Sequence, residues 1–91
     1  MEIKVGSIVR SKAGRDKGDF FIVLSVEDNY VYMANGELRK VDQPNKKKLR
    51  HLQGTDEVSE FVANKIAQGL KVTNSEVRKA LAQAGREKNN G

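Results

Sequence analysis

The ten residues 11–20, SKAGRDKGDF, decide how the first half of this chain folds. Short apolar runs lie directly before and after this stretch. An apolar run, a glycine-bounded turn and a second apolar run predict a strand, a loop and a strand. Because glycine adopts positive φ without steric cost, Gly14 and Gly18 allow a tight loop. Arg15 and Lys17 would then project from its tip, where two cations could meet a phosphate backbone.

The remainder of residues 1–54 is also typical of β structure. Its runs are rich in β-branched and aromatic residues, which favour strands over helices. Asp28-Asn29 indicates a compact turn, and Asn35-Gly36 is the strongest short hairpin signal in the chain. We expect five strands, at residues 3–9, 20–26, 30–34, 37–41 and 48–52. Five short strands joined by tight turns predict a small curled barrel.

Residues 55–85 change to helical periodicity and predict two short helices. In the first, Val58, Phe61, Val62, Ile66 and Leu70 share one face. We expect Phe61 to anchor this helix, with Thr55 or Asp56 as its cap and Gly69 as its stop.

The second helix begins at a capping box, Thr73-Asn74-Ser75-Glu76. Its apolar stripe is Val77, Ala80, Leu81 and Ala84, and Gly85 should end it. Isolated short helices are marginal in water, so both stripes must pack on something. The barrel is the favoured support, ahead of the other helix or a partner. The predicted organisation is a barrel at 1–54, a helical pair at 55–85 and a flexible tail at 86–91.

The composition excludes several classes of site. The 91 residues suit one domain with an appendage, and they include no cysteine, so disulfides, thiolate metal sites and cysteine nucleophiles are excluded. That usage fits a reducing cytoplasm. No signal peptide or membrane-length apolar run is apparent. The single histidine, His51, has no second His or Cys to complete a metal site and no evident catalytic partner. We therefore expect no enzyme activity, no metal and no cofactor.

Positive charge is concentrated in one segment. The formal net charge of the chain is +5, and residues 39–50 alone account for it. Such a balance favours an anionic partner, most commonly nucleic acid, although a basic run can also be merely a solvated loop. The six cations of this segment are Arg39, Lys40, Lys46, Lys47, Lys48 and Arg50.

Two tyrosines extend the candidate site. In the strand predicted at 30–34, alternation places Tyr30 and Tyr32 on one face and Val31 and Met33 on the other. A tyrosine ring could stack on an unpaired base. The alternative, which we favour at this point, is that one or both tyrosines complete the surface or core of the barrel.

The first module resembles the KOW motif of ribosomal proteins and transcription factors, and is most similar to the archaeal and eukaryotic large-subunit ribosomal protein family fourteen-e. The resemblance spans residues 5–54. The residues that carry it are Val5-Gly6, Ile8-Val9, Ala13-Gly14-Arg15-Asp16-Lys17-Gly18, the runs 20–26 and 30–34, Asp28-Asn29, Gly36, Arg39-Lys40, Asn45 and His51-Leu52.

This resemblance implies an SH3-like β-barrel that binds RNA, usually ribosomal RNA, with Arg15, Lys17 and Arg39-Lys40 in that role. The chain departs from the family in the added run Lys46-Lys47-Lys48 and in its helical pair, which has no counterpart there. We expect a small stand-alone bacterial relative, monomeric when free, that contacts ribosomal RNA and in some settings ribosomal proteins. The alternative is a protein-interaction module of the transcription or translation machinery, docking through the apolar helix stripes.

Overall fold

The glycine-bounded loop joins the first two strands as the sequence predicts. Strands β1 (Ser7–Ser11) and β2 (Phe20–Glu27) pair antiparallel on either side of it, with Val9 opposite Phe21. Gly14 and Gly18 both have φ near +90°, the left-handed region in which a side chain would be strained. The backbone N–H of Gly18 donates to the Ser11 carbonyl at 2.8 Å and closes the loop.

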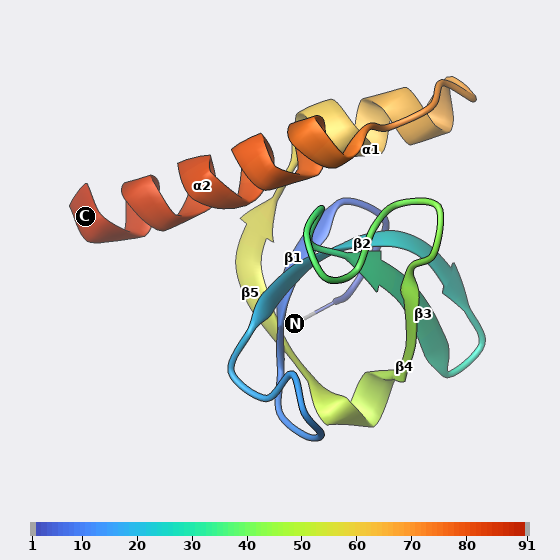
Figure 1. Ribbon diagram of the computed structural model, residues 1–91, viewed down its shortest axis with the longest axis vertical. Helices are drawn as coiled ribbons and strands as arrows, with labels where there is room; N and C mark the ends of the chain where they lie inside the picture. The colour runs from blue at the N-terminus through green and yellow to red at the C-terminus, as the bar shows by residue number, and fades with distance from the viewer. Residues whose placement is uncertain (1, 91) are drawn as a thin grey trace.

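The computed structural model describes the backbone of residues 2–90 and the side chains of residues 2–84. Its strands form one antiparallel sheet in the order β4-β3-β2-β1-β5, followed by two helices (Figure 1). The elements are β1 (Ser7–Ser11), β2 (Phe20–Glu27), β3 (Tyr30–Ala34), β4 (Asn45–Lys48), the 3₁₀ turn η1 (Leu49–His51), β5 (Leu52–Val58), α1 (Glu60–Ala67) and α2 (Asn74–Asn90).

The sheet curls around one core and carries the helices on a second. Alternate side chains of β1 and β2 point to opposite faces. Thus Val9 and Phe21 enter the inner cluster with Val23, Val31, Met33 and Leu52. Ile8 and Ile22 instead pack on Val62 of α1, on Val77 of α2 and on Val72 from the segment between the two helices. This second cluster confirms that the helices pack on the sheet.

Segment 37–41 is not a strand, which corrects the hairpin predicted at Asn35-Gly36. The Asn35 side-chain oxygen accepts from the backbone N–H groups of Glu37 and Arg39, each at 3.0 Å. These bonds fold the backbone into a closed turn instead of extending it. The turn packs on α2, where Arg78 Nη1 donates to the Gly36 carbonyl at 2.7 Å. Tertiary packing thus overrode a valid local hairpin signal.

The last two strands also lie elsewhere than predicted. The expected strand at 48–52 is divided, because η1 occupies residues 49–51. Strand β4 lies before it and pairs with β3, with Lys47 opposite Val31. Strand β5 lies after it and pairs with β1 as far as Val58, so the sheet crosses the boundary predicted at residue 54. A run of three lysines has little β propensity of its own. It becomes a strand here because it pairs with the neighbouring strand β3.

Both helices are present, but their ends and anchors differ from expectation. Ser59 caps α1, accepting from Val62 N–H, rather than Thr55 or Asp56. Phe61 is 55% exposed, while Val62 is fully buried and anchors the helix. Helix α2 continues past Gly85 over residues predicted to be a flexible tail. Gly91 lies outside the described residues.

The capping box of α2 is confirmed. Thr73 Oγ1 accepts from the Glu76 N–H, and a Glu76 carboxylate oxygen accepts from the Thr73 N–H. Lys65 Nζ donates to the same carboxylate and ties α1 to α2. The bond from Thr73, together with Lys65, lowers the pKa of Glu76. Neither helix, through residue 90, is long and apolar enough to cross a membrane.

Candidate nucleic-acid interface

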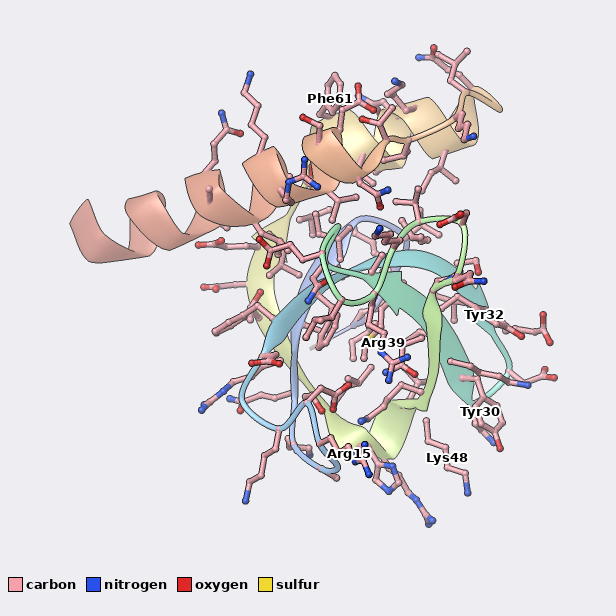
Figure 2. The ribbon with its side chains drawn as sticks, viewed as in Figure 1. Arg15, Tyr30, Tyr32, Arg39, Lys48 and Phe61 are labelled. Carbon is pink, nitrogen blue, oxygen red and sulfur yellow. The ribbon has the colours of Figure 1, made fainter. Side chains whose placement is uncertain are left out.

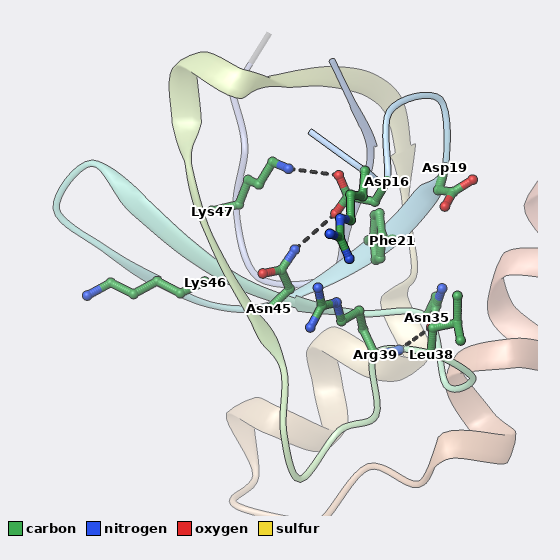
Figure 3. Close-up of a pocket in the computed structure, with 10 residues that line it drawn as sticks. Asp16, Asp19, Phe21, Asn35, Leu38, Arg39, Asn45, Lys46 and Lys47 are labelled. Atoms are coloured by element: carbon green, nitrogen blue, oxygen red, sulfur yellow. Dashed lines mark hydrogen bonds and ion pairs between the residues drawn. The ribbon is translucent and has the colours of Figure 1, made fainter. Parts of the chain in front are cut away.

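Asp16, from the loop between β1 and β2, joins that loop to β4. Its Oδ1 accepts from Ser11 Oγ at 2.7 Å and from Lys47 Nζ at 2.8 Å. Its Oδ2 accepts from Asn45 Nδ2 at 3.0 Å (Figure 3). The sequence pattern gave Asp16 only a turn role, because the partners on β4 are 29 and 31 residues away. We call this group the Asp16 cluster: Ser11, Asp16, Asn45 and Lys47.

The Asp16 cluster favours the charged carboxylate. Burial raises the pKa of Asp16, but hydrogen bonds from Lys47 and Ser11 and the Lys47 charge act in the opposite direction. Their combined effect outweighs burial and holds the pKa of Asp16 below its usual range. Asp16 is therefore an ionised anchor at neutral pH, with its oxygens occupied by donors.

Lys47 belongs to this cluster and not to the exposed basic surface. Its side chain is only 13% exposed, and its Nζ donates to the Ala13 carbonyl as well as to Asp16. The reason is the alternation along β4, which turns Asn45 and Lys47 inward and Lys46 and Lys48 outward. Three consecutive lysines therefore have two different roles.

The outer face of β3 and β4 carries paired tyrosines and lysines. Tyr30 is opposite Lys48 and Tyr32 is opposite Lys46, with all four side chains on one face. Lys46 Nζ lies 4.5 Å from the Tyr30 ring centroid and 5.9 Å from that of Tyr32. Both distances are within the range of a cation–π interaction. We call this group the Tyr–Lys platform: Tyr30, Tyr32, Lys46 and Lys48.

A pocket of about 560 Å³ lies beside the platform, between the 12–19 loop and the 35–44 loop. Figure 3 shows the Arg39 side chain reaching from the second loop toward the side of the pocket where Asn45 and Asp16 lie. Arg15 contributes a second guanidinium from the first loop. The lining residues are Arg15, Asp16, Asp19, Phe21, Asn35, Leu38, Arg39, Asn45, Lys46 and Lys47.

The other predicted residues lie at the margins of this surface. Arg50 lines a second hollow of about 430 Å³ together with Tyr30 and Lys48. Lys17 and Lys40 are exposed but line neither of these two pockets. Figure 2 shows Arg15, Lys48, Tyr30 and Tyr32 on the side of the sheet away from the helices, with Phe61 at the opposite end.

Six residues that line the pocket were not among the predicted site residues: Asp16, Asp19, Phe21, Asn35, Leu38 and Asn45. Asn35 was predicted to lie in a hairpin turn, and Leu38 in a strand. Leu38 is 87% exposed, the most exposed large apolar side chain of the described residues. A leucine directly before the basic segment 39–50 is the one sequence signal that could have indicated an apolar wall there.

No group of three or more His, Cys, Asp or Glu side chains in the described residues is arranged to hold a metal ion. The backbone carbonyl of His51 accepts from Lys12 N–H, which gives this residue a structural place at the start of β5. Comparison of the chain with protein-family models and with curated proteins finds no match.

Proposed function

We propose that this chain is a non-enzymatic RNA-binding protein that acts on or near the ribosome, built on an SH3-like barrel of the KOW type. The observation that carries the proposal is the Tyr–Lys platform beside the two-arginine pocket. Aromatic faces interleaved with cations suit a polynucleotide, because bases stack on rings while phosphates pair with the cations. Phosphate contacts set position and affinity, with little reading of sequence.

The fold supports this proposal. The sheet is antiparallel throughout, and its last strand returns to pair with its first. The resulting curl brings the 12–19 loop against β4, although the two are distant in sequence. The 12–19 loop and the part of the basic segment that forms β4 therefore lie side by side.

In this proposal the predicted cations have different roles. Arg15, Arg39, Lys46 and Lys48 border the platform and pocket and are the proposed phosphate contacts. Lys17, Lys40 and Arg50 extend the positive field around them. Lys47 is assigned to the Asp16 cluster, since its ammonium is already paired.

The interaction-module alternative receives less support. It required exposed apolar stripes on the helices, but Val62 and Val77 are fully buried against β1 and β2. Helix α1 retains Phe61 as an exposed apolar side chain, with Lys65 Nζ 5.6 Å from its ring centroid. RNA binding therefore remains the proposal that accounts for more of the surface.

Replacing Lys46 and Lys48 together by glutamine should weaken binding to a structured ribosomal RNA fragment about tenfold at low salt. The slope of log K against log salt should become shallower by about 2, since each phosphate contact contributes roughly one. Fluorescence anisotropy at four salt concentrations measures both quantities.

Lys71→Gln with Lys79→Gln provides the matched control, because these exposed lysines lie before and on α2 and the change in net charge is identical. The control should retain nearly full affinity and the full slope. Equal losses in the two variants would show non-specific attraction to a basic protein. Cosedimentation with ribosomal subunits, followed by crosslink mapping, tests the ribosomal setting.

A further inference from the structure

The pocket beside the platform has the size and lining of a ligand site. Its volume of about 560 Å³ lies within the range of roughly 300–1,000 Å³ usual for small-molecule sites. Phe21 and Leu38 supply apolar walls, while Asn35, Asn45 and two arginines supply polar groups. A few placed polar groups on an apolar lining are typical of a site that orients its ligand.

Two side-chain amides of the lining each have one polar atom without a hydrogen-bond partner among the described residues. Asn35 Oδ1 accepts from two backbone N–H groups, which fixes Nδ2 as its other end. Asn45 Nδ2 donates to the Asp16 carboxylate, which fixes Oδ1 as its other end. Within the described residues no hydrogen bond occupies either remaining atom. The lining of the pocket thus carries one unoccupied amide donor, on Asn35, and one unoccupied amide acceptor, on Asn45.

The charges of the pocket suit a nucleotide. Arg15 and Arg39 form no ion pair with any carboxylate of the described residues. Asp16 is occupied by Lys47, so it adds little repulsion. Figure 3 shows the Asp19 carboxylate on the far side of Phe21 from Asn45 and Lys47. Phosphates can therefore approach the two arginines from the side of the pocket away from Asp19.

Leu38 is the most unusual member of the lining. An exposed leucine at the mouth of a basic pocket has no stabilising role in the free protein, since it is 87% exposed. It could instead cover one face of a planar ring, with a guanidinium covering the other. A base can stack between Leu38 and Arg39 only if it is unpaired and lies outside the RNA double helix.

We infer that this pocket binds a single unpaired nucleotide of the RNA, with its base beside Leu38 and its flanking phosphates on Arg15 and Arg39. The inference rests on the proposed function and makes it more specific. The preferred RNA is a helix interrupted by a bulge or loop, because a paired base cannot enter a pocket. The platform would contact the backbone beside the bulge.

The test uses two RNA hairpins that differ at one position. One carries 2-aminopurine as a single-nucleotide bulge, and the other carries it paired with uracil. The protein should bind the bulged hairpin about tenfold more tightly, and the bulge fluorescence should change on binding. Leu38→Ser should reduce that preference to less than threefold.

Leu70→Ser is the matched control, since Leu70 is 52% exposed and lies after α1, away from the pocket. It should keep the preference. Equal binding of both hairpins by the unaltered protein would overturn the inference while leaving the proposed function standing. Binding of neither hairpin, nor of ribosomal RNA, would overturn both. A bulge preference that survives Leu38→Ser would place the unpaired base elsewhere on the surface.

Discussion

Replacing Gly36 by alanine is expected to destabilise the protein by about 3 kcal/mol. Gly36 has φ +79°, and left-handed backbone costs an alanine about 1–2 kcal/mol. A Cβ there would also lie 2.5 Å from the Asn74 carbonyl oxygen and 2.8 Å from Arg78 Cγ. Because backbone atoms cannot move aside without cost, this steric overlap adds about 1–3 kcal/mol to the loss of stability.

This cost reflects how α2 is attached. The first turn of α2 docks on the 35–41 loop through the Arg78 bond to the Gly36 carbonyl and a bond from Val41 N–H to Asn74 Oδ1 at 2.9 Å. A side chain at position 36 would separate the loop from the helix and break both bonds. Urea unfolding, followed by far-UV circular dichroism, measures the loss as a lowered midpoint.

The variant Gly69→Ala distinguishes the two contributions to the cost of Gly36→Ala, which are backbone strain and steric overlap. Gly69 has φ +74°, close to that of Gly36, but no atom lies within 4 Å of a Cβ built there. Its substitution should cost only the backbone strain, about 1 kcal/mol. Equal losses at positions 36 and 69 would mean that the loop gives way and that α2 does not depend on this contact.

The features that sequence predicted correctly are local. The capping box of α2 needs only residues 73–76, and the alternation in β3 needs only residues 30–34. The paired glycines of the 12–19 loop are similar, because positive φ is decided within the loop. Each of these features is determined by interactions among residues close in sequence, so contacts with distant residues do not easily change it.

The features that sequence missed depend on distant partners. Asn35-Gly36 is a valid hairpin signal. However, the segment that would form the returning strand is instead hydrogen-bonded to α2. In α1, either Phe61 or Val62 could face the sheet, because shifting the start of the helix by one residue rotates its buried face. The cap at Ser59 fixes that start, and Val62 is the residue that is buried. Lys47 could not be separated from Lys46 and Lys48 until β4 was known to pair with β3.

Replacing Asp16 by alanine is expected to cost about 2 kcal/mol of stability at pH 7. The change removes an acceptor of three side-chain hydrogen bonds and leaves the Lys47 ammonium, 13% exposed, without a counter-charge. Loss of one partner of a charged, partly buried bond typically costs about 1–3 kcal/mol. Asp19→Ala in the same loop is the control, and an exposed residue of this kind should change stability by less than about 0.5 kcal/mol.

A double-mutant cycle with Lys47→Met isolates the pair. Methionine keeps the apolar stem of the lysine and removes its charge, so the single change should cost about 1 kcal/mol. If the two side chains stabilise each other, the double variant should lose less than the sum of the single losses, by about 1 kcal/mol. Additive losses would show that the ion pair contributes nothing beyond the separate bonds of Asp16 and Lys47.

The stability difference between the unaltered protein and Asp16→Ala should also depend on pH. Because folding lowers the pKa of Asp16, the unfolded chain binds its proton first as pH falls. The stabilisation is therefore complete above the ordinary aspartate pKa, near about 4, and is lost as pH falls from there through the lowered value. Glu76 also has a lowered pKa but is present in both proteins, so its contribution cancels in the difference. A gap that stays constant from pH 7 down to pH about 2.5 would contradict an ionised Asp16 as the anchor that positions Arg15 and the pocket beside it.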